Sequence, residues 1–131
     1  MENNFFNTII KFSSQFYFGW VIFIGLLTLL PGSVIPNIDW NFLSLDKIIH
    51  LSVFTILAYF GSAFFIYGFN KKPLKNAVLL SFIIAVIYGT LLEYSQTFIP
   101  ERGFDYADLS ANILGAISGT IIFLLLKNKY Q

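Results

Sequence analysis

The feature that most constrains this chain is a series of four nearly uninterrupted apolar runs, separated by short segments that hold all the prolines. Two of these runs, AVLLSFIIAVIYGTLLEYSQTF and ADLSANILGAISGTIIFLLL, have the length of roughly 20 residues that an α-helix needs to cross a membrane. Charged residues make up 11% of the chain, against about 25% in soluble domains. The composition therefore argues against a water-soluble fold.

These runs predict an all-α fold: a polytopic integral membrane protein built as one bundle of four transmembrane helices. We expect a single domain over residues 1–131, with spans at about residues 15–30, 47–69, 77–98 and 107–126. The four prolines fall outside these spans, where they remove no backbone hydrogen bond from a helix interior. The first span reaches full length only if part of the preceding FFNTIIKFSS is also helical.

The charges indicate how the bundle lies in the membrane. Lysines gather at the amino terminus, between the second and third spans, and at the carboxyl terminus: Lys11, Lys71, Lys72, Lys75, Lys127 and Lys129. Acidic residues lie at the other end of the predicted bundle: Asp39, Asp46, Glu93, Glu101, Asp105 and Asp108. Because basic loops stay in the cytoplasm, we expect both termini to be cytoplasmic and the acidic end to face outward.

The second span begins with three polar residues on one helix face, Asp46, Lys47 and His50, because residues three or four positions apart are neighbours. They could form an ordinary helix start, with a capping aspartate and a lysine that reaches the headgroups. His50 lies one turn deeper, where an ionisable side chain is costly and calls for a partner or a function.

Near the end of the third span, Glu93 and Gln96 also share a face. Glu93 lies roughly one turn inside the end of the span, and an acid at this depth should face protein rather than lipid. A structural hydrogen bond and a functional role are both open for it.

The fourth span carries the clearest pattern, a stripe in which Asp105, Asp108, Asn112, Gly115 and Gly119 follow one another in steps of three and four. The two glycines allow a second helix to approach closely, either within the chain or from another copy in a homo-oligomer. Asp108 could also simply stabilise the positive end of its helix.

Arg102, in the loop PERGFDY, can bind a carboxylate or a phosphate through two parallel hydrogen bonds. It could clamp Asp105 or Asp108 within the chain, or it could contact an anion on a ligand. Four aromatic residues that could stack on rings flank this end: Trp40, Tyr94, Phe104 and Tyr106. We predict one outward ligand-binding site formed by Asp46, Lys47, His50, Glu93, Gln96, Arg102, Asp105, Asp108 and Asn112.

Three classes of function fit such a site. As a binding protein, the chain would hold the polar head of a membrane lipid or of a lipid-linked cell-wall precursor. As an enzyme, it would use His50 or Glu93 as catalytic general base on a lipid phosphate or ester. As a structural cluster, the charges would only neutralise one another and fix the bundle. Nucleic acid is not an expected partner.

A metal centre is not expected from the spacing of these residues. The chain has no HExxH motif and no cysteine, and a single histidine with scattered carboxylates matches metal-site spacing poorly. A divalent-ion site from His50, Glu93 and Asp108 would require the fold to bring three spans together. We therefore predict no metal and no other cofactor.

The segments DKIIHLSVFTILAYF and EYSQTFIPERGFDYADLSANILGAISG resemble the signature blocks of the VanZ-like family. Those blocks read D-K-x-x-H, E-x-x-Q, then an Arg, an Asp and a D-x-x-x-N-x-x-G tail, and here they fall on Asp46, Lys47, His50, Glu93, Gln96, Arg102, Asp105, Asp108, Asn112 and Gly115. The resemblance covers about residues 45–120 and implies a multi-pass protein of the bacterial inner (cytoplasmic) membrane, acting in the cell envelope. The namesake of the family is associated with low-level resistance to the glycopeptide antibiotic teicoplanin.

Overall fold

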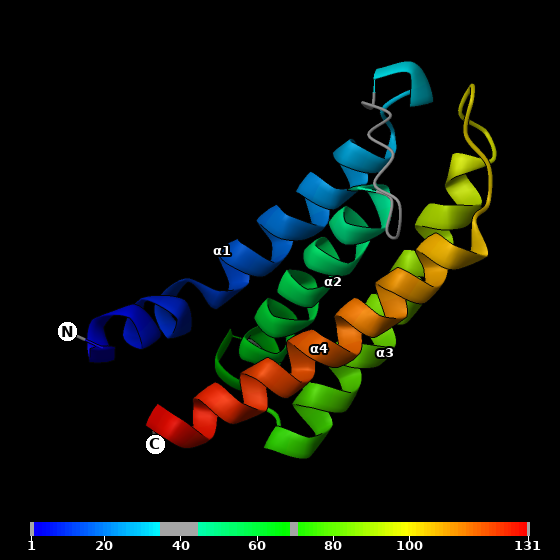
Figure 1. The fold of residues 1–131 in the computed structure, drawn as a ribbon. Coiled ribbons are helices and arrows are strands. Elements are labelled where there is room, and N and C mark those ends of the chain that lie inside the picture. The colour runs from blue at the N-terminus through cyan, green and yellow to red at the C-terminus, as the bar shows by residue number, and fades with distance from the viewer. Residues whose placement is uncertain (1, 35–44, 69–70, 131) are drawn as a thin grey trace.

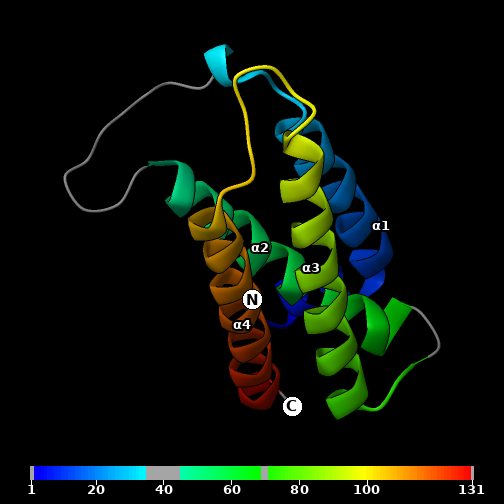
Figure 2. The same cartoon turned by 90° about the vertical axis from the view of Figure 1, so that its right-hand side faces the viewer.

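The computed structural model describes residues 2–34, 45–68 and 71–130. Their long helices are α1 (Glu2–Thr28), α2 (Leu45–Ala63), α3 (Leu74–Gln96) and α4 (Tyr106–Tyr130), with a short 3₁₀ turn at Gly32–Val34 and a π-helical turn at Phe64–Gly68. The four helices lie side by side in an elongated bundle (Figures 1 and 2). The described part of the chain contains no strand.

Each helix contains a segment that is long and apolar enough to cross a membrane: Ile10–Thr28, Leu45–Gly68, Leu74–Gln96 and Tyr106–Lys127. The predicted all-α class with four such helices is therefore confirmed. The start of α3 and the end of α1 lie toward opposite ends of the bundle, and the carboxyl end of α4 lies near the start of α3 (Figure 1).

The first helix differs most from the predicted span. It begins at Glu2 rather than near residue 15, and its backbone leaves helical geometry at Phe12, where φ is −111° and ψ is 16°. The segment FFNTIIKFSS is thus helical, as a full-length first span required. The physical reason is that the apolar run after Gln15 is too short by itself for a hydrocarbon layer about 30 Å thick.

The helical backbone of the second span continues beyond the end of α2 at Ala63. A π-helical turn, Phe64–Gly68, extends it toward the α2–α3 connection, and the Lys72 N–H donates a hydrogen bond to the Phe65 carbonyl at 3.0 Å. The residues of this turn, FFIYG, are apolar like those of the preceding α-helix. Hydrophobic periodicity therefore did not distinguish the π turn from a continued α-helix.

The contact between α2 and α4 is a close approach of two backbones. A Cβ atom added to Gly119 would overlap the carbonyl oxygen of Thr55, and one added to Gly115 would overlap that of Leu51. The glycines therefore pack against α2 of the same chain, which is one of the two uses expected for them. A homo-oligomer through this face would have to displace α2 and stays a prediction.

Hydrogen bonds also join the helices through their side chains. Three of these bonds end on backbone carbonyls of a neighbouring helix: Trp20 to Val53 (2.8 Å), Tyr88 to Val21 (2.7 Å) and Ser81 to Ala58 (2.9 Å). Lipid offers no gain for burying apolar surface between helices, so close packing and such hydrogen bonds hold a membrane bundle together. Together they join α1, α2 and α3 to one another.

The glycine contact leads to a first prediction. Gly119→Ala should destabilise the bundle by about 1–3 kcal/mol, because neither the added methyl group nor the Thr55 backbone has room to move. The measurement is the thermal midpoint of the detergent-purified protein. Gly19→Ala is the matched control, since no atom lies within 4 Å of its added Cβ, and it should melt at or above the wild-type temperature. Equal melting of the two variants would contradict the prediction.

Candidate functional site

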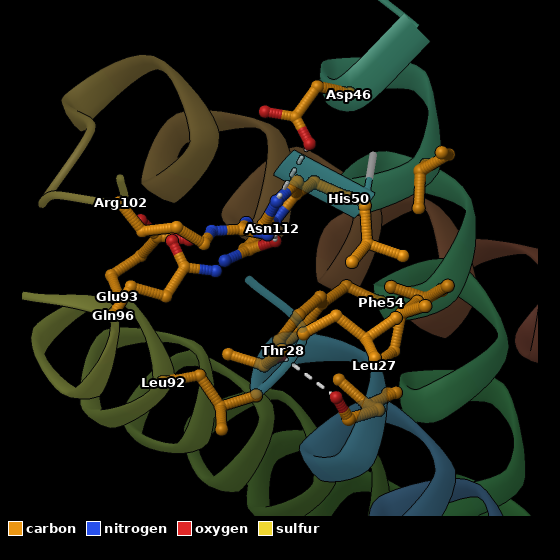
Figure 3. A pocket seen from close by; sticks show the side chains of 15 residues that line it. Leu27, Thr28, Asp46, His50, Phe54, Leu92, Glu93, Gln96, Arg102 and Asn112 are labelled. Atoms are coloured by element: carbon orange, nitrogen blue, oxygen red, sulfur yellow. Dashed lines mark hydrogen bonds and ion pairs between the residues drawn. The ribbon is translucent and has the colours of Figure 1, made fainter. Parts of the chain in front are cut away.

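Polar residues gather at the end of the bundle where α2 begins, α3 ends and α4 begins (Figure 3). The first turns of α2 supply Asp46, Lys47 and His50. The last turns of α3 supply Glu93 and Gln96, the α3–α4 connection supplies Arg102 and Asp105, and α4 supplies Asp108 and Asn112. Three helices that are distant in sequence therefore meet here through side chains of both charge signs.

Lys47 is the centre of an ionic cluster between α2 and α4. Its Nζ atom lies 2.7 Å from Asp108 Oδ1 and 3.2 Å from Asp105 Oδ2. The Asp108 side chain is 5% exposed, so its carboxylate depends on this cation for compensation. Lys47 thus ties the start of α2 to the start of α4.

Asp105 caps the amino-terminal end of α4. Its Oδ1 atom accepts a hydrogen bond of 2.7 Å from the backbone N–H of Ala107, in the second position of the helix. This hydrogen bond is the main reason that the pKa of Asp105 lies below its ordinary value of 3.8; partial burial opposes the shift, and Lys47 adds to it. Asp105 thus makes the capping hydrogen bond, whereas Asp108 lies in the first turn of α4, where its carboxylate can also stabilise the positive end of the helix.

His50 is surrounded by oxygen atoms on both sides of its ring. Nδ1 lies 2.9 Å from Asn112 Oδ1 and 3.6 Å from Glu93 Oε1. Nε2 lies 3.6 Å from Asp46 Oδ1 and 3.9 Å from Asp108 Oδ2. Because an amide oxygen can only accept, the tautomer that makes this hydrogen bond carries a proton on Nδ1 and donates it to Asn112 Oδ1.

A cavity of about 210 Å³ opens beside this cluster. Its polar wall consists of Asp46, His50, Glu93, Gln96, Arg102 and Asn112 (Figure 3). Its remaining wall is mostly hydrocarbon and consists of Ile24, Leu27, Thr28, Leu30, Val34, Ile49, Val53, Phe54 and Leu92. The cavity therefore joins a polar end to an apolar side.

Three buried polar atoms on this polar wall lack a hydrogen-bond partner within the described structure: Glu93 Oε1, Arg102 Nη1 and Asn112 Nδ2. A buried polar group left without a partner costs about 1–3 kcal/mol. Two of the atoms are donors and one is an acceptor. Such a set can bind a molecule that offers both oxygen acceptors and a hydroxyl or amide donor.

The guanidinium of Arg102 was expected either to clamp a carboxylate of the chain or to contact a ligand. Among the described residues, the ion pairs of Asp105 and Asp108 involve Lys47 and His50, and Arg102 clamps neither carboxylate. Its backbone forms a turn, with N–H donating to the Ile99 carbonyl at 3.2 Å. The guanidinium thus lies at the cavity wall without an ion pair to any described carboxylate, although it is close enough to Glu93 for their charges to interact.

The predicted site residues divide into two groups. Those lining the cavity are Asp46, His50, Glu93, Gln96, Arg102 and Asn112, whereas Lys47, Asp105 and Asp108 form the adjacent ionic cluster. Sequence reasoning missed the contribution of α1, whose residues Ile24 and Leu27 complete the apolar wall together with Leu30 just after the helix. These are ordinary aliphatic residues of a membrane span, and no pattern in the sequence distinguishes them from lipid-facing neighbours.

Three of the four aromatic residues expected to flank the site, Tyr94, Phe104 and Tyr106, lie outside the cavity wall. Tyr94 and Tyr106 are exposed, and Phe104 packs edge-on against Tyr106 with ring centroids 5.0 Å apart. Trp40 lies outside the described residues. In the connection before Phe104, the residue with left-handed backbone geometry is Glu101, where φ is 63°.

One grouping of side chains could hold a metal ion. Asp46, His50 and Asp108 offer ligand atoms that all lie within 4.8 Å of one another. The sequence predicted no metal site, and the trio considered as an alternative had Glu93 in place of Asp46. The structure places Glu93 on the Nδ1 side of His50 and both aspartates on the Nε2 side.

Fold and site together define a class: a small multi-pass membrane protein with a mixed polar and apolar cavity at one end of a four-helix bundle. Within that class, a family model described as VanZ/LLP1 matches residues 2–127, and the chain belongs to this family. The resemblance to the VanZ-like family is thereby confirmed, and the match extends through α1 as well. No curated protein and no solved structure gives a match.

The ionic cluster leads to a second prediction. Lys47→Met should lower the free energy of unfolding by about 2–3 kcal/mol, because it leaves the buried carboxylate of Asp108 without its cation. The double variant Lys47→Met, Asp108→Asn should lose less than the sum of the single losses. Thermal unfolding of wild type, Lys47→Met, Asp108→Asn and the double variant measures the coupling energy between the two side chains. Additive losses would show that the two charges do not interact.

Asp105 leads to a third prediction, about pH. Because the folded chain lowers the pKa of Asp105, its ionised form stabilises the fold above the ordinary value of 3.8, and this contribution is lost as the pH falls below 3.8. Asp105→Asn keeps a capping oxygen and removes the charge. The difference in thermal midpoint between wild type and Asp105→Asn should shrink on acidification from neutral pH, and a constant difference would contradict the assignment.

Proposed function

We propose that this VanZ-family membrane protein uses its cavity to hold the polar head of an envelope lipid or of a lipid-linked cell-wall precursor. The observation that carries the proposal is the set of buried, unpartnered atoms Glu93 Oε1, Arg102 Nη1 and Asn112 Nδ2 on one wall of a cavity whose other wall is hydrocarbon. A lipid headgroup supplies both surfaces at once, because its polar atoms and its tail are joined in one molecule.

The chemistry of the wall indicates what the head should carry. Arg102 and Asn112 offer donors that fit phosphate or sugar oxygens, and a guanidinium suits a phosphate in particular. Glu93 Oε1 offers an acceptor that fits a hydroxyl group. A phosphorylated or glycosylated head meets both needs, whereas a zwitterionic head without hydroxyl groups leaves Glu93 without a donor.

The proposal places the cavity on the outer side of the cytoplasmic membrane of a bacterium. It rests on the charge distribution: Lys71, Lys72 and Lys75 lie at the α2–α3 end of the bundle, and the acids lie at the cavity end. At the outer side, retention of a cell-wall precursor would change what a glycopeptide such as teicoplanin can reach. A role in resistance would arise in this way.

A second candidate is a hydrolase or transferase that acts on a lipid phosphate or ester. It is favoured by the contact of 3.6 Å between His50 Nδ1 and Glu93 Oε1 at the cavity wall, since a carboxylate beside an imidazole makes it a better general base. In this mechanism, His50 and Glu93 are the catalytic residues. Release of inorganic phosphate or of a fatty acid from bound lipid would distinguish it from retention without turnover.

The fourth prediction tests the binding proposal. Native mass spectrometry of the gently purified protein should show a specific envelope lipid on wild type. Arg102→Ala and Glu93→Gln should reduce its retention about tenfold or more, because each removes a charged hydrogen-bonding group. Glu101→Gln is the control, since Glu101 is exposed in the same connection and outside the cavity wall.

Folding must be matched before these spectra are compared, through equal abundance and equal thermal midpoints. Equal retention by wild type, Arg102→Ala and Glu93→Gln would overturn the lipid-binding proposal. A parallel loss of abundance and lipid would instead favour a structural role for the cluster.

A further inference from the structure

Three potential metal-ligand atoms converge beside the cavity from α2 and α4. Asp46 Oδ1 and Asp108 Oδ2 lie 3.6 Å and 3.9 Å from His50 Nε2, and the candidate ligand atoms of the three residues all lie within 4.8 Å of one another. Ligands at about 2.0–2.2 Å from one tetrahedral ion lie about 3.3–3.6 Å apart. The separation of Asp46 and His50 fits this spacing, and Asp108 must move closer for the trio to share a cation.

The hydrogen bond of His50 directs its free ring nitrogen toward this point. Nδ1 donates to Asn112 Oδ1 at 2.9 Å, so in the neutral ring Nε2 presents its lone pair to the two aspartates. Lone pairs and carboxylates facing one another repel unless a positive charge lies between them. A metal-ligating histidine commonly donates its other N–H to an oxygen atom in this manner.

Lys47 does not supply the missing positive charge. It lies 2.7 Å from Asp108 Oδ1, which leaves Oδ2 of the same carboxylate toward His50, and its second partner is Asp105. No ion pair joins it to Asp46 among the described residues. Asp46 and one oxygen of Asp108 thus remain without a fixed cation.

The cavity provides an independent observation in favour of a bound ion. Asp46 and His50 line it, so an ion held by the trio can be reached from the cavity and keeps free coordination positions toward it. Glu93, which is fully buried and whose Oε1 has no hydrogen-bond partner in the described structure, lies on the same cavity wall but on the Nδ1 side of His50, so it is not a ligand of this ion. Three protein ligands with an open position are the arrangement of catalytic rather than structural zinc sites.

We propose that Asp46, His50 and Asp108 bind one divalent cation, and that its open coordination positions face the cavity. One imidazole nitrogen with two carboxylate oxygens suits Zn²⁺ or Mn²⁺ better than Ca²⁺ or Mg²⁺, which take oxygen ligands. This site goes beyond the lipid proposal and does not require it, because all its ligands belong to the chain.

The fifth prediction tests the metal site on the full chain in detergent, stripped with a chelator and titrated with Zn²⁺ and with Mn²⁺. Elemental analysis after desalting should find one ion per chain, and the ion should raise the thermal midpoint. Asp46→Asn and His50→Gln should each weaken binding more than about tenfold, and Asn112→Ala should weaken it about 10- to 100-fold by releasing the histidine ring. Glu101→Gln, outside the trio, should bind as wild type does.

Each outcome decides the proposal. Folded wild type that binds neither ion at one per chain would overturn it. Unchanged binding by Asp46→Asn and His50→Gln would overturn it too. Because Asp46 lies at the edge of the bundle with its side chain 36% exposed, its variant remains informative if His50→Gln fails to fold. Wild type that binds the metal but retains no specific lipid would count against the lipid proposal alone.

Discussion

The close approach of α2 and α4 is the contact on which the polar end of the molecule depends. Gly115 and Gly119 let the two backbones meet without intervening side chains. The same stripe of α4 continues through Asn112 to Asp108, so the spacing set by the glycines also brings His50 and Lys47 of α2 within reach of these side chains. A wider separation would leave buried charges facing each other across hydrocarbon, at a high cost.

The polar residues at this end have two different physical tasks. Lys47, Asp105 and Asp108 satisfy one another and hold the starts of two helices together. Glu93, Arg102 and Asn112 keep atoms unsatisfied on the cavity wall, although the surrounding bundle is apolar. Such atoms are the places where a native structure stores a cost that a bound molecule can relieve. The ionic cluster of Lys47, Asp105 and Asp108 therefore stabilises the bundle, whereas Glu93, Arg102 and Asn112 are available to bind a ligand.

Helical periodicity in the sequence predicts which residues share a helix face, but it does not predict which side chains meet across the bundle. Steps of three and four in the sequence place Asp105, Asp108, Asn112, Gly115 and Gly119 on one face of α4, because helical spacing is a local property. The choice of Lys47 over Arg102 as partner of Asp108 depends on side-chain reach across the bundle. The α1 wall and the π turn after Ala63 were missed because apolar residues in lipid look alike in sequence.

The size of the cavity has a consequence for what kind of selectivity it can exert. A cavity of about 210 Å³ is large enough for a phosphate or part of a sugar and for the first carbons of a chain, but not for a whole acyl or prenyl chain. Most of whatever tail accompanies the head must therefore lie among the surrounding lipids. The protein would therefore discriminate among heads while tolerating tails of different length and saturation, and its affinity would change little when a cell alters its fatty-acid composition.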